Sequence, residues 1–197
     1  MAYFFFDFKD TAKQDSRSFL SSVLIQLSSQ SDSFCNILLE FYLTHQRGSK
    51  QPTDSALLRC LEKMLKVPVN VPIYLIIDGV DECPNTSGVQ SPRAKVLKLL
   101  VKLVGFQLSS LRLCVTSRSE ADTRNVLEPL TSTSSRISLH DEDGQKKDIA
   151  DYVSWVVYSD TKTMKWQEED KKLVIRALSD RSGGVYVSSL SARVTLF

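Results

Sequence analysis

Three carboxylates follow one apolar run near the middle of the chain. Residues Tyr74 to Ile77 are all apolar, and Asp78, Asp81 and Glu82 come soon after them. An apolar run of this kind predicts a strand buried on both faces of a parallel sheet. Carboxylates gathered at one strand end repel one another unless a cation or a hydrogen-bond donor offsets the repulsion. These residues therefore point to binding of a hard cation such as Mg²⁺.

The spacing of these carboxylates is that of a Walker B segment. In such a segment the strand-end aspartate, here Asp78, holds Mg²⁺ beside the phosphates of a nucleotide. Gly79 leaves room beside that aspartate. A plain strand that ends in an Asp-Gly turn is the alternative interpretation. The two further carboxylates favour the Walker B interpretation, because their repulsion is costly without a compensating charge.

The other half of a nucleotide site is missing from these 197 residues. A P-loop requires Gly-x-x-x-x-Gly-Lys-Ser/Thr, whose backbone amides and lysine surround the phosphates. The segment Gly48-Ser49-Lys50 comes nearest, but it lacks the first glycine and follows no strand. None of the other glycines has the required lysine and hydroxyl residue after it; they are Gly79, Gly88, Gly105, Gly144, Gly183 and Gly184.

Arg118 follows a second apolar run, Leu111 to Thr116. A guanidinium at this place matches phosphate oxygens, so we expect Arg118 to contact a γ-phosphate. The alternative is an ordinary surface arginine in a loop. Since the carboxyl ends of parallel strands meet at one edge of a sheet, Arg118 and Asp78 are expected at the same edge.

Other chemistries find no support in the spacing of residues. His45 and His140 stand apart from each other and from any cysteine at ligand spacing, which argues against a zinc site. Ser117 and Ser119 lack the Gly-x-Ser-x-Gly context of a hydrolase nucleophile.

The hydrophobic periodicity predicts an α/β chain with strands and helices in alternation. Strands are expected at 3–8, 74–78, 111–116 and 136–139. Helices are expected from Asp15 to 27, from Asp32 to 42, at 57–65, from Ser91 to 104, through 126–127, at 143–158 and at 166–180. This alternation predicts right-handed crossovers and a parallel sheet with helices on both faces.

Composition describes an ordinary globular protein. Charged residues make up 24% of the chain and the net charge is +2, with basic residues spread among acidic ones, so no nucleic-acid partner is expected. No apolar run has transmembrane length, so no membrane association is expected. Cys35, Cys60, Cys83 and Cys114 form no C-x-x-C pair, and we interpret them as reduced core residues of a cytoplasmic protein.

At this point the motifs resemble a known family. The segment Tyr74–Pro84 resembles the Walker B segment of NACHT-type STAND NTPases, and Leu113–Arg118 is similar to their sensor 1 segment. The run Phe4–Phe8 resembles the strand after the P-loop helix, and Ile149–Val153 the helix after the fifth strand. The most similar proteins by these motifs are fungal, with a nephrocystin-like N-terminal P-loop domain.

The resemblance implies a role for each matched residue. Asp78 would be the metal ligand for Mg²⁺, and Asp81 or Glu82 would orient or deprotonate the attacking water. Arg118 would contact the γ-phosphate of ATP. Members of the family are signalling switches in which ATP binding opens the chain to oligomerise.

The chain departs from the family pattern in three places. The expected P-loop before Tyr3 is absent, Ser119 stands where proline is usual, and the residues after Gly183 do not continue the expected aromatic helix. We therefore expect a three-layer P-loop NTPase-like α/β sheet that lacks its first (P-loop) strand, in a domain truncated before the Walker B half. The expected divisions are a partial NACHT domain at 1–142, a helical segment at 143–182 and a divergent tail at 183–197.

These features predict a nucleotide-dependent signalling domain. Its complete form would use ATP and Mg²⁺, whereas this chain is not expected to bind or hydrolyse ATP. The alternative is a degenerate, non-enzymatic interaction module derived from a STAND NTPase. Protein partners or self-association are expected in both cases. At the place of the P-loop strand we expect a gap, closure by the strand at 136–139, or the tail around Val194 to Leu196.

Overall fold

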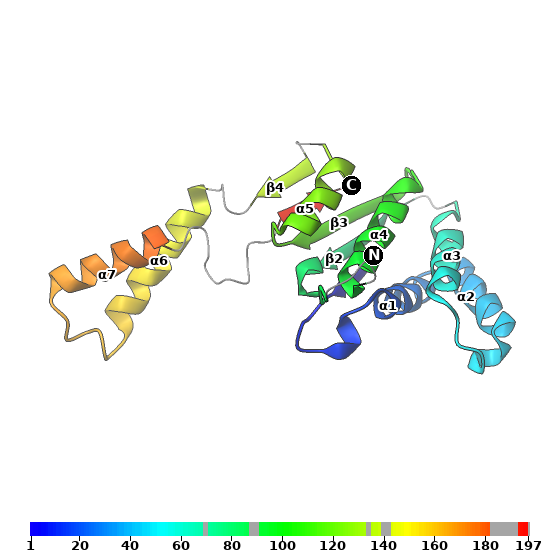
Figure 1. Cartoon of the computed structure of the whole chain (residues 1–197), viewed down its shortest axis with the longest axis horizontal. Coiled ribbons are helices and arrows are strands. Elements are labelled where there is room, and N and C mark those ends of the chain that lie inside the picture. The colour runs from blue at the N-terminus through cyan, green and yellow to red at the C-terminus, as the bar shows by residue number, and fades with distance from the viewer. Residues whose placement is uncertain (69–70, 87–90, 133–134, 139–142, 182–192, 197) are drawn as a thin grey trace. The chain divides into compact units, whose positions relative to one another are not determined.

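The chain forms an α/β structure, seen in a computed structural model (Figure 1). It describes residues 1–68, 71–86, 91–132, 135–138, 143–181 and 193–196. The strands are β1 (Ala2–Phe5), β2 (Ile73–Asp78), β3 (Leu111–Ser117), β4 (Arg136–Ser138) and β5 (Arg193–Leu196). The α-helices are α1 (Ser16–Ser28), α2 (Asp32–Thr44), α3 (Asp54–Leu65), α4 (Pro92–Gly105), α5 (Ala121–Leu127), α6 (Asp143–Ser159) and α7 (Glu168–Arg181). Four short 3-10 turns complete the described elements: η1 (Thr11–Lys13), η2 (Gln46–Gly48), η3 (Val80–Glu82) and η4 (Glu128–Leu130).

Three parallel strands form the part of the sheet that carries the acidic cluster. Strand β1 pairs with β2 in the register Ala2 to Leu75, and β2 pairs with β3 in the register Ile73 to Leu111. Both pairs are parallel, as the alternation of strands and helices predicts. The chain leaves β2 and β3 at the same edge, so Asp78 and Ser117 end neighbouring strands.

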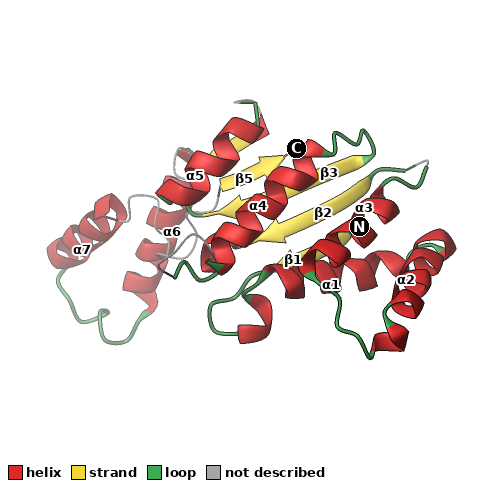
Figure 2. Cartoon of the chain, turned by 45° about the vertical axis from the view of Figure 1, so that its right-hand side comes forward, coloured by secondary structure: helices red, strands yellow, loops and turns green. Residues whose placement is uncertain are grey.

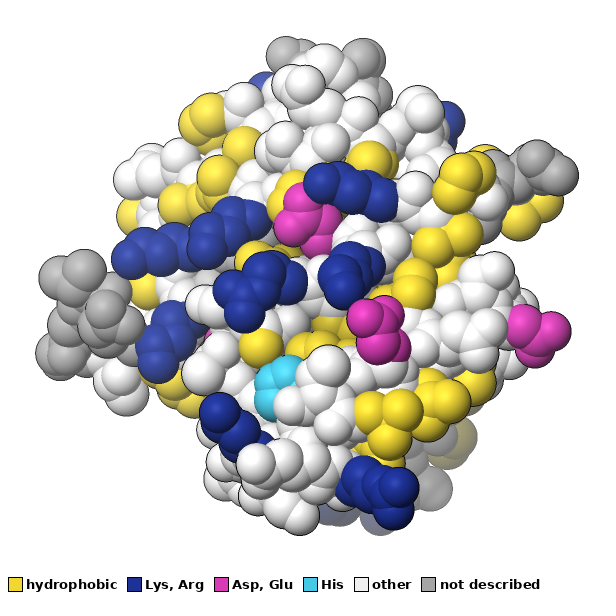
Figure 3. Space-filling view, turned by 90° about the vertical axis from the view of Figure 1, so that its right-hand side faces the viewer, with side chains coloured by type: hydrophobic (Ala, Val, Ile, Leu, Met, Phe, Trp, Pro, Cys, Tyr) yellow, Lys and Arg dark blue, Asp and Glu magenta, His cyan; other side chains and the backbone are white. Residues whose placement is uncertain are grey.

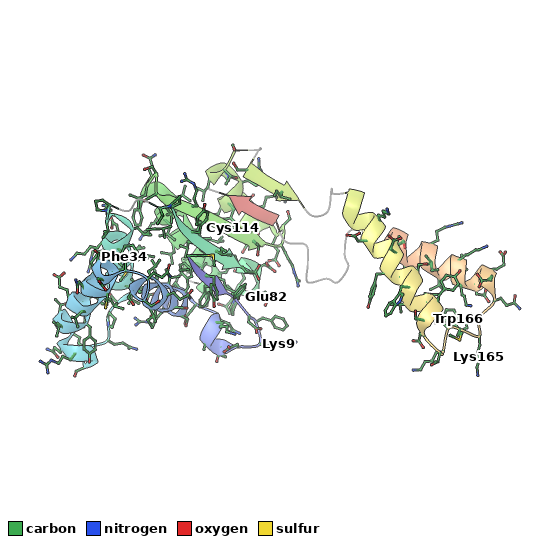
Figure 4. The ribbon with its side chains drawn as sticks, turned by 180° about the vertical axis from the view of Figure 1, so that it is seen from behind. Lys9, Phe34, Glu82, Cys114, Lys165 and Trp166 are labelled. Atoms are coloured by element: carbon green, nitrogen blue, oxygen red, sulfur yellow. The ribbon has the colours of Figure 1, made fainter. Side chains whose placement is uncertain are left out.

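The helices described against these strands cover one face only. Alternate residues of β2 are buried, but Tyr74 is 51% exposed, so the prediction of a strand buried on both faces is wrong. The prediction of helices on both faces fails for the same part of the sheet. The strand order runs β1, β2, β3 in one direction, and right-handed crossovers then place every connecting helix on the same side. Figure 2 shows α1, α4 and α5 in front of the strands, and Figure 4 shows the sheet from behind.

The buried core lies between that covered face and the helices. Inward residues of the strands, such as Phe4, Leu75 and Leu113, pack in one cluster with residues of α1, α3 and α4. Phe4 and Phe6 contact Phe19 of α1 edge to face or stacked, which fixes that helix against β1. Burial of this apolar surface is the main force that holds the strand ends in place.

Local signals mark several helix starts. Asp15 caps α1 by accepting from the backbone N–H of Ser18, and Ser91 caps α4 by accepting from that of Ala94. The helices expected from Asp15 and from Ser91 are therefore confirmed, each with that residue as its N-cap. The helix expected from Asp32 begins at that residue as α2, and its capping position falls on Ser31, which makes no side-chain cap.

The tail strand occupies a place inside the sheet. The strand order is β1-β2-β3-β5-β4, so β5 lies between β3 and β4. The three alternatives expected at the place of the P-loop strand concerned the slot between the strands at 111–116 and 136–139, and the tail is the one observed in that slot. Leu139, the predicted end of the strand at 136–139, lies outside the described residues, as does most of the predicted tail at 183–197.

The chain divides into two compact units, one of Met1–Arg136 with Val194–Phe197 and one of Ile137–Arg193. The second unit contains α6 and α7, which lie side by side as a helical hairpin (Figure 1). The predicted domain boundaries at 142 and 182 stay predictions. Among the helices that the structure describes, none combines the length and the apolar character needed to cross a membrane.

Candidate functional site

The turn after β2 places Asp78 beside Thr116 of β3. The Thr116 hydroxyl donates to the Asp78 carboxylate and accepts from the backbone N–H of Gly79 at 3.0 Å. Gly79 has a φ of +68°, and a Cβ there would lie 3.3 Å from the backbone oxygen of Phe6. Since few residues with a Cβ adopt this conformation, glycine is needed for the chain to turn so close to Phe6.

The structure brings Asp81 and Arg118 together. One Asp81 carboxylate oxygen accepts from the backbone N–H of Arg118 at 2.8 Å. The other lies 3.2 Å from Nε of the same arginine, and the Asp81 side chain is only 7% exposed. Two predicted site residues from different strand ends therefore form one ion pair. Repulsion among the carboxylates requires a cation or a hydrogen-bond donor nearby, and Arg118 supplies both for Asp81.

Glu82 lies apart from that pair and faces the segment after β1. Its carboxylate accepts from the backbone N–H of Phe8 at 3.3 Å. Figure 4 shows Glu82 at the strand end, next to the loop that carries Lys9. Each of the three carboxylates thus has its own donor. Within the described part of the chain, no group of three or more His, Cys, Asp or Glu side chains could hold a metal ion. Asp78 remains a candidate as a single protein ligand.

Comparison with known proteins identifies the family. A family model described as nephrocystin 3, N-terminal, matches residues 1–118, which is more than half of the chain. The chain belongs to the nephrocystin 3 N-terminal family. The match runs from β1 to Arg118 and so includes the whole acidic strand end with its arginine. Searches of curated proteins and of solved structures found no significant match.

In this nephrocystin 3 N-terminal domain a buried arginine joins the two loops of the site. Arg93, in the first turn of α4, donates from Nε to the Cys83 carbonyl at 2.9 Å and from Nη2 to the Asp81 carbonyl. Its Nη1 contacts the carboxylates of Glu120 and Asp122 after β3. Arg93 thus ties the loop after β2 to the loop after β3.

Sequence reasoning did not identify Arg93. A weak signal was available, because a basic residue in the first turn of a helix opposes the helix dipole and needs another partner. Asn85 adds a second link, since it donates to Asp122 at 3.0 Å and accepts from the capping Ser91. Together these contacts hold the backbone of Asp81 and the loop after β3 against the start of α4.

The cysteines of the nephrocystin 3 N-terminal domain differ in their surroundings. Burial raises the pKa of Cys83 to about 12 and that of Cys60 to about 11. Burial also raises the pKa of Cys114, with a further contribution from the Asp78 charge. These thiols stay protonated at neutral pH and are poor nucleophiles. The interpretation of all four as core residues holds for Cys60 and Cys83, but it is wrong for Cys35, which is exposed on α2, and for Cys114, which is only partly buried on β3 and lies outside the core cluster.

Proposed function

We propose that this chain supplies the metal-binding and sensor half of a NACHT-type, ATP- and Mg²⁺-dependent signalling switch. The observation that carries the proposal is the joining of two strand ends by the Asp78–Thr116 and Asp81–Arg118 contacts. In an open α/β sheet, ligands bind outside the carboxyl ends of the strands, where these residues lie.

The residues at Asp78 suit a magnesium ion. A carboxylate with a neighbouring hydroxyl is a hard oxygen donor set, and Mg²⁺ commonly takes one or two carboxylates along with water and phosphate oxygens. One Asp78 oxygen is engaged by Thr116, and the other makes no hydrogen bond with the described residues. Asp78 and Thr116 would therefore hold the ion. When bound, Mg²⁺ would neutralise part of the phosphate charge.

The Asp81–Arg118 ion pair implies different roles for Asp81, Arg118 and Glu82. Asp81 is buried and engaged by both the backbone and the side chain of Arg118, so its role is to position the arginine. Arg118 is 35% exposed, which leaves its guanidinium open to a γ-phosphate at the rim. Glu82 is less constrained, because it accepts a single long hydrogen bond from Phe8. Of the two candidates for orienting an attacking water, Glu82 is the better placed.

Paramagnetic broadening by Mn²⁺ tests this proposal on the intact chain. In an amide NMR spectrum of the labelled protein, Mn²⁺ should selectively broaden the signals of Gly79 and Thr116. The variant Asp78→Asn keeps the shape of the side chain but removes its charge, and the selective broadening should disappear. Asp122→Asn is the matched control, since Asp122 also lies on the rim but contacts Arg93. Equal broadening in Asp78→Asn and the parent protein would refute the assignment of the metal ligand.

A second candidate function is non-enzymatic self-association, and the α6–α7 hairpin favours it. This hairpin exposes large apolar side chains, among them Trp155 at 64% and Leu173 at 65%. Exposed aromatic residues of this size are typical of protein interfaces. Sedimentation velocity over a range of concentrations tests this function. The change Trp155→Ser should shift an oligomer toward monomer, and a concentration-independent monomer in the parent protein would contradict it.

A further inference from the structure

A groove away from the strand ends has the form of a small-molecule site. It has a volume of about 420 Å³ and lies among α1, α2, the loop after α2 and the start of α3. Its walls are almost entirely apolar, with Leu24, Leu38, Phe41 and Leu57 among the residues that form them. The volume falls within the range in which proteins bind small ligands. Figure 3 faces the α2–α3 end of the first unit, where hydrophobic and basic side chains lie close together.

The loop that closes one end of the groove is conformationally costly. Gln46, Arg47 and Gly48 have φ values of +53°, +52° and +85°. The first two carry a Cβ and rarely adopt this left-handed conformation. A Cβ on Gly48 would lie 3.2 Å from the Tyr42 ring, so the glycine lets the loop approach Tyr42 closely. Strained segments of this kind occur preferentially at ligand sites.

The same loop fixes a histidine in the wall. His45 lies with its ring centroid 4.3 Å from that of Phe41, and its Nδ1 is 2.8 Å from the Phe41 backbone oxygen. The carbonyl of His45 accepts from the backbone N–H groups of Gly48 and Lys50. These contacts hold the end of the groove in one shape and place Lys50 in its lining.

Lys50 is the charged residue of this lining. Its ammonium group forms no ion pair or hydrogen bond with the described residues, so it is free to pair with the anionic end of a ligand. An apolar groove with one unpaired cation complements a ligand with an apolar body and one anionic end. We propose that this groove binds a small amphipathic acid, of the class of medium-chain carboxylates, with its carboxylate at Lys50.

The rate of alkylation of Cys35 can report whether a ligand occupies the groove. It lines the groove and is exposed, whereas Cys60 and Cys83 are buried. The pKa of the two buried thiols is raised, so iodoacetamide should modify Cys35 first. If decanoate occupies the groove, the alkylation rate of Cys35, followed by peptide mass spectrometry, should fall as decanoate is added and reach a plateau.

Two variants test separately the charge of Lys50 and the space inside the groove. Lys50→Ala should weaken protection by decanoate about threefold, as loss of one partly exposed ion pair implies, and should leave protection by decanol unchanged. Ser21→Phe should fill the groove from α1 and abolish protection by both compounds. Lys98→Ala, an exposed lysine outside this groove, is the control and should behave like the parent protein.

Several outcomes would overturn the proposal. Unchanged Cys35 alkylation in the presence of decanoate would exclude an amphipathic acid as the occupant. Equal protection by decanoate and decanol in the parent protein would exclude the role of Lys50. Protection that persists in Ser21→Phe, with the circular dichroism spectrum preserved, would place the binding elsewhere. Protection by a protein fraction but not by decanoate would identify a macromolecular partner for this surface instead.

Discussion

Replacement of Arg93 by methionine should destabilise the first unit strongly, because this guanidinium joins both loops of the site. Methionine keeps the apolar stem but leaves the carbonyls of Cys83 and Asp81 without their donor. Two hydrogen bonds from a charged donor together contribute about 3 kcal/mol. Loss of the pairs with Glu120 and Asp122 adds less than about 1 kcal/mol, since both carboxylates are partly exposed. We expect a total loss of about 3–4 kcal/mol in the free energy of unfolding.

The chain offers separate probes for its two units. All four cysteines lie in the first unit, and both tryptophans, Trp155 and Trp166, lie in the second. Alkylation of Cys60 and Cys83 during urea titration therefore reports on the first unit, and tryptophan fluorescence on the second. For an m-value of about 2 kcal/mol per molar urea, Arg93→Met should lower the alkylation midpoint by roughly 1.5–2 M. The fluorescence midpoint should not change.

Arg124→Met is the matched control for this experiment. Arg124 is exposed on α5, so its replacement should change the stability by no more than about 0.5 kcal/mol. Equal effects of the two variants would show that the contacts of Arg93 contribute little net stability. A shift in the fluorescence midpoint would show that Arg93 does not act on the first unit alone.

Two further predictions concern the same unit. Gly79→Ala should destabilise the first unit by about 1–2 kcal/mol, because Gly79 has a positive φ. Gly105→Ala should be neutral or stabilising, because nothing lies within 4 Å of the new Cβ. Urea unfolding measures the stability of both variants. Stability should also fall above pH 9, because the unfolded thiols ionise there while burial keeps the pKa of Cys60 near 11 and that of Cys83 near 12. Each thiol lowers the free energy of unfolding by about 1.4 kcal/mol per pH unit between its unfolded and folded pKa. Cys83→Ala should therefore make stability, measured by circular dichroism, depend less steeply on pH. An unchanged slope in this variant would contradict the prediction.

Local signals allowed much of the fold to be predicted. The apolar runs before Asp78 and Arg118 form strands, and Asp15 and Ser91 cap helices, because each depends on residues within a few positions. The coverage of the sheet could not be predicted in this way. It depends on the order of strands in space, and the order β1-β2-β3 places the connecting helices on one face.

The meeting of Asp78, Asp81 and Arg118 at one edge of the sheet was predictable, but the ion pair that two of them form was not. Position after a strand was enough to bring Asp78, Asp81 and Arg118 to one edge. Sequence could not show that Asp81 and Arg118 neutralise each other, because two loops far apart in the chain meet there. The same limit applies to Arg93, whose partners come from both loops, and to the exposure of Cys35 beside the groove.

Titration of the labelled chain with Mg-ATP, followed by amide NMR, tests the proposed half-site most directly. Without the amides and lysine of a P-loop in these 197 residues, the remaining groups should give a dissociation constant on the order of millimolar or weaker. The account predicts shifts confined to the amides of 78–82 and 116–118, and their loss in Asp78→Asn. Micromolar binding would contradict the account, as would shifts elsewhere in the chain or shifts that survive in Asp78→Asn.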